Sequence, residues 1–356
     1  MKVLTVVGNR PQFIKAAAVS PALRAKHEEL LIHTGQHFDD TLSAIFFSEL
    51  GLPAPDRELG IALGSNSSQT ARMLTVLEPT LAELEPDVLL VYGDTNSTLA
   101  GALAGAQAGI PVAHVEAGLR SFDRTMPEEL NRVVADHASS LLLCPSAVAV
   151  NNLEREAVSG TVELVGDVMV DVALKLAPVA KARTDVLATY GVGQGDFVLA
   201  TAHRAGNVDD RQRLKALVEL LLALEAFVVF AVHPRTRARL EAGGLLSELQ
   251  ASDRVKLTAP LGYVEFSALL HNARAVMTDS GGVQKEAYLA GVPCVTLRAN
   301  TEWTETVEHG WNTLVGLDAQ RAREALARPV PQERPPLYGD GHAGDRVVDA
   351  LTLHYA

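Results

Sequence analysis

Short apolar runs alternate with longer amphipathic or small-residue segments from the start of the chain. A short, continuously apolar run between turn residues is typical of a strand buried on both faces of a parallel sheet. The first half of the chain contains such runs at Val3–Val7, Leu30–His33, Val88–Tyr92, Val112–Val115, Leu141–Cys144 and Val162–Leu164. Helices are expected between them, beginning near Pro11 and covering Ser68–Glu83 and Thr98–Gly109. This alternation predicts a βαβ array with a mainly parallel sheet.

A second array follows a helical segment over Asp167–Tyr190 and a glycine-rich loop. Its expected strands are Phe197–Thr201, Val228–Val232, Val255–Leu257, Ala275–Thr278 and Cys294–Leu297, and its expected helices are Gln212–Leu224, Tyr263–His271 and Val283–Ala290. The sequence therefore predicts an α/β protein with two doubly wound, Rossmann-like domains that face a central cleft. The expected domains are residues 1–168 and 169–341, with a C-terminal helix within 342–356 that packs back on the first domain. Such clefts are common places for small-ligand sites.

Composition and charge narrow the class of protein. The chain has 356 residues, 47% of them hydrophobic, and a formal net charge of −12. This charge argues against a nucleic-acid or membrane-surface partner, but local positive groups and helix N-termini would still allow an anionic small molecule. No signal peptide and no apolar run of about 20 residues is present, so we expect a soluble, cytoplasmic protein. The two cysteines, Cys144 and Cys294, lie in apolar runs and are expected to be reduced core residues.

Three acidic motifs lie close together between residues 89 and 132. Asp94 and Glu116 each follow a predicted buried strand, and Glu128 follows Pro127 at the start of a predicted helix. Parallel strands place the residues that follow them at one sheet edge, where open α/β folds bind ligands. Because no metal-binding motif accompanies these carboxylates, their convergence favours proton-transfer chemistry. Local roles remain open: Asp94 as a helix N-cap, and Glu128 as a favourable charge at the helix start that pairs with Arg132.

The second half of the chain carries candidate anion-binding groups. His203 and His233 each follow a predicted strand of the second array. The motif Asp279-Ser-Gly-Gly282 joins a strand to a helix, so the N–H groups of its last three residues can cradle a phosphate. Glu286 lies one turn further and can accept hydrogen bonds from a ribose diol. Arg10 follows the first strand and is a further candidate anion contact. Its motif lacks the glycine pattern of dinucleotide sites, so no nicotinamide cofactor is expected. No CxxC or HExxH motif is present, so no metal is expected either.

Taken together, these motifs resemble the non-hydrolysing UDP-N-acetylglucosamine (UDP-GlcNAc) 2-epimerases. The resemblance covers nearly the whole chain and includes, beside the acidic motifs, Gly8-Asn-Arg-Pro-Gln-Phe-Ile-Lys15, Ala202-His-Arg204, Val232-His-Pro234, Asp279-Ser-Gly-Gly282 and Tyr338-Gly-Asp-Gly341. It implies a two-domain fold of the glycosyltransferase-B type, a homodimer, and a role in cell-surface polysaccharide biosynthesis.

The resemblance also implies a reaction and a set of residues. UDP-GlcNAc would lose UDP to give 2-acetamidoglucal, and UDP would add back after C2 is reprotonated on the other face, which yields UDP-ManNAc without a cofactor. The positions tied to catalysis are Asp94, Glu116, Glu128 and His203. Those that match UDP or phosphate contacts are Arg10, Arg132, His233, Ser280, Gly281, Gly282 and Glu286. A second, activating UDP-GlcNAc site would involve Lys15, Gln36, His37 and Arg72.

Several positions depart from the pattern of many members, and three of them concern the identity of the sugar. They are Asn9, Gln12 and Trp303. A Trp at the last position is similar to a branch that acts on UDP-2,3-diacetamido-2,3-dideoxy-glucuronate, which makes that sugar the alternative substrate. A UDP-sugar glycosyltransferase is a more distant alternative, because it needs fewer convergent carboxylates.

Overall fold

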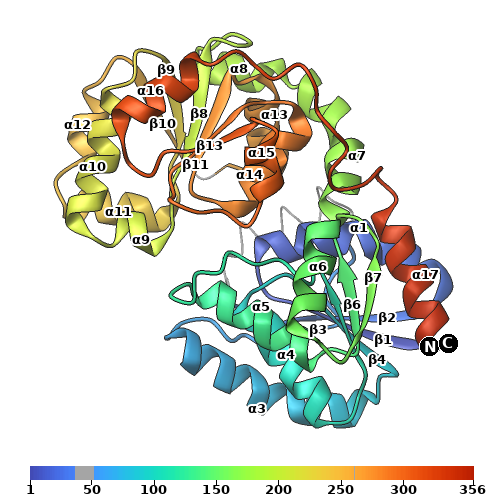
Figure 1. Ribbon diagram of the computed structural model, residues 1–356. Helices are drawn as coiled ribbons and strands as arrows, with labels where there is room; N and C mark the ends of the chain where they lie inside the picture. The colour runs from blue at the N-terminus through green and yellow to red at the C-terminus, as the bar shows by residue number, and fades with distance from the viewer. Residues whose placement is uncertain (37–51, 260) are drawn as a thin grey trace. The chain divides into compact units, whose positions relative to one another are not determined.

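The computed structural model describes residues 1–36, 52–259 and 261–356, with Arg10 described by its backbone alone. The chain forms two compact units (Figure 1). Unit 1 comprises Met1–Leu174 and Pro336–Ala356, and unit 2 comprises Lys175–Pro335. Each unit contains one parallel sheet with helices on both faces, so the predicted α/β fold class is confirmed.

The described part of unit 1 forms a seven-stranded sheet in the order β3-β2-β1-β4-β5-β6-β7. Every neighbouring pair is parallel. Six of the strands coincide with the predicted apolar runs to within two residues, whereas the short edge strand β3 has no such run. The strands are β1 (Lys2–Val7), β2 (Glu28–His33), β3 (Arg57–Glu58), β4 (Val88–Tyr92), β5 (Val112–Val115), β6 (Leu141–Cys144) and β7 (Thr161–Leu164).

Helices cover both faces of this sheet (Figure 1). The helices of unit 1 are α1 (Arg10–Lys26), α3 (Asn66–Leu84), α4 (Asn96–Gln107), α5 (Pro127–Ala138), α6 (Ala147–Glu156) and α17 (Ala343–Tyr355), and α7 (Val168–Ala182) runs from unit 1 into unit 2. On one face, α4 packs between α3 and α5, and its side of the core includes Leu4, Val6 and Met73. The C-terminal helix α17 lies beside α1, where Lys26 pairs with Asp349 at 2.6 Å.

Unit 2 repeats the architecture with a six-stranded parallel sheet, among its described residues, in the order β10-β9-β8-β11-β12-β13. The strands are β8 (Phe197–Thr201), β9 (Phe227–Ala231), β10 (Val255–Thr258), β11 (Ala275–Thr278), β12 (Cys294–Thr296) and β13 (Asn312–Leu314). The helices are α8 (Thr184–Tyr190), α9 (Ala205–Val208), α10 (Arg211–Leu222), α11 (Pro234–Ala242), α12 (Leu246–Gln250), α13 (Tyr263–Asn272), α14 (Gly281–Ala290), α15 (Thr304–Glu308) and α16 (Ala319–Ala327). Two buried clusters, one on each face of the sheet, form the core of the unit.

Local sequence explains where the prediction and the fold differ. The segment Asp167–Tyr190 is two helices, because the chain breaks at Arg183 between α7 and α8. Strand β13 was not predicted, since it has only three residues and begins with the polar Asn312. Helix α14 begins at Gly281, two residues earlier than expected, so the glycine pair belongs to its first turn.

The strand order places a topological switch point in each sheet. In unit 1 the chain winds outward in opposite directions from β1 and β4, which are neighbours. In unit 2 the corresponding neighbours are β8 and β11. Open α/β sheets bind ligands beyond the carboxyl ends of the strands at such points. Asp94 follows β4, and Asp279 follows β11, so predicted motifs lie at both switch points.

Candidate active site

Asp94 is held from two sides by consecutive residues of α5. Its carboxylate Oδ2 lies 2.5 Å from an Arg132 guanidinium nitrogen, and its backbone carbonyl accepts a hydrogen bond from Asn131 Nδ2 at 3.0 Å. The N-cap of α4 is Thr95, which forms a capping box with Thr98. The alternative role of Asp94 as the N-cap is therefore wrong, and its carboxylate is oriented by Arg132 instead.

Glu116 lies in a tight turn directly after β5. Its φ of +72° is in the left-handed region, which non-glycine residues rarely adopt and which costs about 1–2 kcal/mol. The Glu116 carboxylate contacts the Lys15 ammonium, and both side chains are buried. A Cβ atom on Gly93 would lie 2.9 Å from Lys15 Nζ and 3.2 Å from Glu116 Oε2. The Gly93 backbone thus packs directly against this ion pair, with Asp94 as the next residue.

The two glutamates at the start of α5 have different surroundings. Glu129 is buried, and its carboxylate accepts hydrogen bonds from the backbone N–H groups of Ser121 and Phe122 at 2.9 and 3.0 Å. It also lies 3.3 Å from Arg132. Glu128 is only partly buried. Glu129 therefore stabilises the loop that follows the Glu116 turn through hydrogen bonds to its backbone. Glu128 is the more accessible of the two carboxylates.

In unit 2, Asp279 organises the turn after β8. Its fully buried carboxylate accepts the backbone N–H groups of His203 and Arg204 at 3.0 and 3.1 Å, and Asn207 Nδ2 at 3.0 Å. The His203 ring is more exposed, with Nδ1 at 3.8 Å from Asp279 Oδ1. The sequence singled out Asp279 only as the start of a turn; its position after a strand end, like that of Asp94, was the available signal.

The two predicted strand-end histidines come together. The ring centroids of His203 and His233 are 5.2 Å apart at an interplanar angle of 30°. His233 is also the N-cap of α11, where its Nδ1 accepts the backbone N–H of Arg235 at 3.2 Å. Because Nδ1 accepts a hydrogen bond, the remaining proton of a neutral ring is on Nε2.

The first turn of α14 packs against the carboxylate of Glu302, which lies in the loop before α15. A Cβ atom on Gly281 would collide with the Glu302 carboxylate, which Arg298 holds at 2.9 Å. The backbone N–H of Ser280 donates to Thr278 Oγ1 at 3.0 Å. The expectation that this N–H is available to a phosphate is therefore wrong, and the N–H groups of Gly281 and Gly282 at the helix start are the candidates.

Further along α14, Lys285 and Glu286 have different environments. Lys285 is buried, and its ammonium lies 4.5 Å from the centre of the Trp303 ring, which is a cation–π contact. Glu286, the next residue, is partly buried. Trp303 thus packs against helix α14, whose first turn is the candidate anion-binding site.

The described residues of the implied second site each have their own hydrogen-bond or ion-pair partners. Lys15 contacts Glu116, and Gln36 Oε1 accepts the backbone N–H and the hydroxyl of Ser97 at 3.1 and 2.7 Å. Arg72 donates to the carbonyl oxygens of Ala62 and Leu63. His37 lies outside the described residues. Gln36 is thereby linked to the first turn of α4, just after Asp94.

Two of the unusual positions, Asn9 and Gln12, have structural roles. Asn9 is the N-cap of α1. Gln12 Nε2 donates to the Tyr92 carbonyl at 2.9 Å, and Gln12 Oε1 accepts the Gly8 N–H at 2.8 Å. These contacts tie the carboxyl end of β1 to that of β4. Trp303, in contrast, lies beside α14 through its contact with Lys285.

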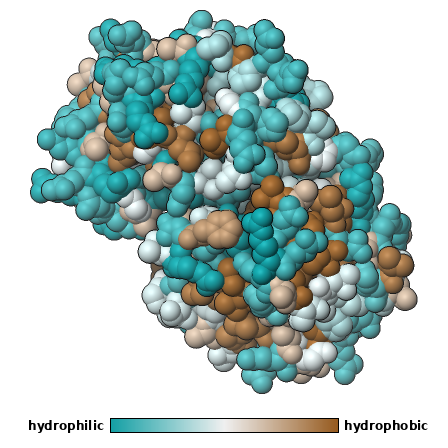
Figure 2. Space-filling view, in the orientation of Figure 1, coloured by the Kyte–Doolittle hydropathy of each residue, from teal (hydrophilic) through white to brown (hydrophobic). Residues whose placement is uncertain are grey.

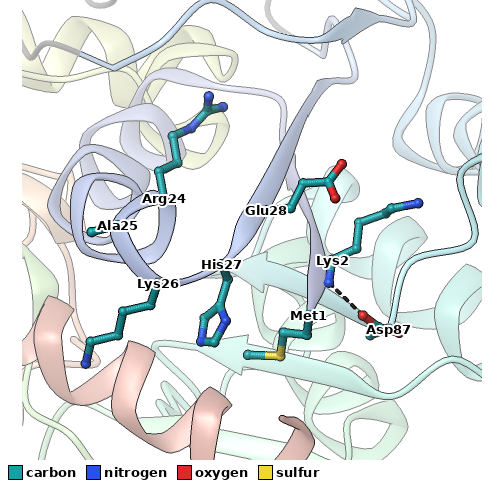
Figure 3. A pocket seen from close by; sticks show the side chains of 8 residues that line it. All are labelled: Met1, Lys2, Arg24, Ala25, Lys26, His27, Glu28 and Asp87. Carbon is teal, nitrogen blue, oxygen red and sulfur yellow. Dashed lines mark hydrogen bonds between the residues drawn. The ribbon is translucent and has the colours of Figure 1, made fainter.

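A surface depression also lies away from these candidate residues. Figure 3 shows a shallow depression in unit 1 around Lys2, Lys26 and His27, where the backbone N–H of Lys2 donates to Asp87. It lies at the amino ends of β1 and β4, opposite the edge that carries Asp94. Figure 2 shows apolar side chains among the polar ones on the drawn face of unit 1. Single exposed apolar residues are normal on protein surfaces and define no site.

No group of three or more His, Cys, Asp or Glu side chains in the described part of the chain has the geometry of a metal site. No helix in the described ranges is both long and apolar enough to cross a membrane.

The geometry defines a two-domain α/β protein with candidate acid–base groups at one switch point and a candidate anion-binding helix start at the other. The family model described as UDP-N-acetylglucosamine 2-epimerase matches residues 22–352. The chain belongs to this family, and it is an epimerase of the isomerase class.

Individual relatives cover almost the full length. A UDP-N-acetylglucosamine 2-epimerase homolog of Methanococcus maripaludis is 46% identical over 99% of both chains. The UDP-2,3-diacetamido-2,3-dideoxy-D-glucuronate 2-epimerase of Pseudomonas aeruginosa is also 46% identical, again over 99% of both. The crystal structure of Methanocaldococcus jannaschii UDP-GlcNAc 2-epimerase in complex with UDP-GlcNAc and UDP matches with a TM-score of 0.93, at 42% identity, over 99% of this chain and 100% of the other.

Proposed function

We propose that this protein is a non-hydrolysing UDP-GlcNAc 2-epimerase that interconverts UDP-GlcNAc and UDP-ManNAc. The observation that carries the proposal is the arrangement around Gly93 in a chain of this family. Asp94, oriented by Arg132, and Glu116, paired with Lys15, flank one glycine at the switch point of the unit 1 sheet. Two oriented carboxylates beside one backbone segment are suited to moving a proton at a single carbon.

The reaction requires proton transfer at C2 without an adjacent ketone. A base removes the C2 proton while the C1–O bond to UDP breaks, which gives 2-acetamidoglucal and UDP. An acid then returns a proton to the opposite face of C2, and UDP adds back to C1. We assign these proton transfers to Asp94, Glu116 and Glu128. The assignment of each carboxylate to a face of the sugar stays open.

Unit 2 would hold the nucleotide. The N–H groups of Gly281 and Gly282 at the start of α14 suit the diphosphate, because a helix start offers hydrogen-bond donors and a positive dipole end. We assign to Glu286 the hydrogen bonds with the ribose diol. We assign to His203 the contact with the departing diphosphate. Further contacts to UDP are assigned to Arg10, Arg132, His233 and the Ser280 hydroxyl.

A second substrate is favoured by a specific observation. The Pseudomonas relative named for the diacetamido-glucuronate sugar is as similar to this chain as the Methanococcus homolog. Trp303 packs against α14 at the proposed nucleotide site. The alternative proposal is therefore the same reaction on UDP-2,3-diacetamido-2,3-dideoxy-glucuronate. The proposed assembly is a homodimer, which light scattering of the purified protein tests directly.

Proton NMR of the protein with UDP-GlcNAc in D2O, without added NAD, tests the function. We expect UDP-ManNAc with deuterium at C2, because the C2 proton exchanges with solvent during elimination and re-addition. Conversion of the diacetamido sugar alone would move the assignment to the second substrate. Release of free ManNAc and UDP would contradict a non-hydrolysing reaction, and no conversion of either sugar would refute both proposals.

A further inference from the structure

A buried chain of charged side chains lies beneath the Asp94 and Glu116 turns. His114, on β5, is fully buried, and both of its ring nitrogens have close partners. Nε2 lies 2.6 Å from the Gly93 carbonyl oxygen, and Nδ1 lies 2.7 Å from Asp136 Oδ1. A carbonyl oxygen can only accept, so Nε2 carries a proton.

Both carboxylate oxygens of Asp136 have close polar partners. Its Oδ2 accepts the Gly118 N–H at 3.1 Å and lies 2.7 Å from Arg120. Burial raises the pKa of this carboxyl, whereas the charges and hydrogen bonds of its neighbours lower it, and the net shift is downward. The Arg120 and Gly118 contacts favour the ionised carboxylate whatever the state of His114. An ionised carboxylate opposite Nδ1 places a proton on that nitrogen too.

A His114 imidazolium would satisfy the contacts of both ring nitrogens. Its charge is balanced by Asp136, and the charge of Arg120 is balanced by Glu156, which Arg120 holds through two hydrogen bonds of 2.7 and 2.8 Å. Positive and negative groups alternate along the chain, so the interior carries no net charge from these four residues. Such pairing is the condition under which buried charges are tolerated.

The His114–Asp136 pair contacts both of the proposed catalytic turns, one through each residue. The His114 hydrogen bond fixes the carbonyl of Gly93, the residue before Asp94. The Asp136 hydrogen bond fixes the N–H of Gly118, in the turn where Glu116 adopts its left-handed conformation. A strained conformation persists only where its surroundings hold it in place. The two turns are thus joined through one ion pair, which sets their relative position.

We propose that His114, kept as an imidazolium by Asp136, is a positioning residue that holds Asp94 and Glu116 in the geometry required for proton transfer at C2. Neither side chain is assigned a contact with substrate; both are buried behind the turns. This inference rests on the proposed function, because it assigns the purpose of the pair to that reaction. The ionisation state of His114, in contrast, can be measured without any substrate.

Asp136→Asn is the informative variant, because it keeps the shape of the side chain and removes its charge. The amide no longer requires a proton on Nδ1, so His114 becomes neutral while Nε2–H can still reach Gly93. We expect kcat to fall about 10- to 100-fold, the usual cost of losing a partner that orients a functional group. We expect KM and the Kd of UDP to stay within about threefold, because ground-state binding is not changed.

Two controls separate positioning from folding. Glu83→Gln removes a carboxylate that pairs with Arg57 on the exposed surface of α3, far from the proposed catalytic turns in sequence, and should leave kcat unchanged. Thermal melting and circular dichroism test whether each variant is folded. An unchanged kcat in Asp136→Asn, or an equal loss of kcat and UDP affinity, would overturn the proposal.

Nitrogen-15 NMR of the histidine rings tests the ionisation state without any substrate. The protein has 11 histidines, and the His114 signals are assigned by their absence in His114→Gln. Both ring nitrogens of wild-type His114 should show shifts of protonated nitrogen at pH 7. An unprotonated nitrogen there overturns the proposal even if Asp136→Asn fails to fold. Wild-type protein that converts neither UDP-sugar refutes the proposed function instead, and the spectrum still decides the charge of His114.

Discussion

Gly93→Ala tests the close packing of backbone against the Lys15–Glu116 pair. Gly93 has a φ of +64°, so an alanine is strained by about 1–2 kcal/mol whatever surrounds it. The new Cβ would also lie 2.9 Å from Lys15 Nζ and 3.2 Å from Glu116 Oε2, which is inside normal van der Waals contact. The pair has to move by several tenths of an ångström, and Asp94 is adjacent to the change.

Gly109→Ala is the matched control for backbone strain. Gly109 follows α4 with a φ of +71°, and a Cβ atom there would meet nothing within 4 Å. The two variants should therefore share the strain, which lowers Tm by about 2–4 °C per kcal/mol for a unit of this size. Only Gly93→Ala should lose epimerase activity, and a displacement approaching 1 Å costs about 100-fold in rate.

The assay is coupled detection of the epimerised UDP-sugar, with kcat and KM measured for both variants beside their melting curves. A kcat for Gly93→Ala equal to that of Gly109→Ala would refute the reasoning, because the strain would then be the whole effect. A loss of activity in Gly109→Ala would refute it as well, since that site has no contact with the proposed catalytic groups.

Three other substitutions have direct readouts. Asp94→Asn should abolish turnover while UDP still binds, as measured by calorimetry; substantial turnover would remove Asp94 from the acid–base assignment. Gly281→Ala should sharply weaken UDP binding, because its Cβ collides with the Glu302 carboxylate at the start of α14, and unchanged affinity would argue against a diphosphate at that helix. Glu286→Ala should weaken UDP binding without changing Tm, and a Kd equal to that of the wild type would exclude the ribose contact.

The sequence alone determined the fold class and the location of the acidic motifs along it. Continuous apolar runs such as Val88–Tyr92 carry the signature of buried parallel strands, because both of their faces are covered. A residue directly after such a strand, like Asp94 or His203, has to lie at the carboxyl edge of the sheet. These inferences need only local pattern and the geometry of parallel strands.

The tertiary structure decided which of these side chains act together. The sequence allowed Asp94 to be a helix cap, and only the packing of α5 beside α4 brought Arg132 to its carboxylate. It did not separate Glu128 from Glu129, because the distinction depends on which of them reaches the backbone of Ser121.

The same limit applies to partners far apart in the chain. Lys15 meets Glu116 across 101 positions, and His114 meets Asp136 across 22. Such contacts depend on strand order, on register and on the turn that puts Glu116 in a left-handed conformation. None of these is encoded in the spacing of the residues themselves, because they result from packing the whole sheet at once.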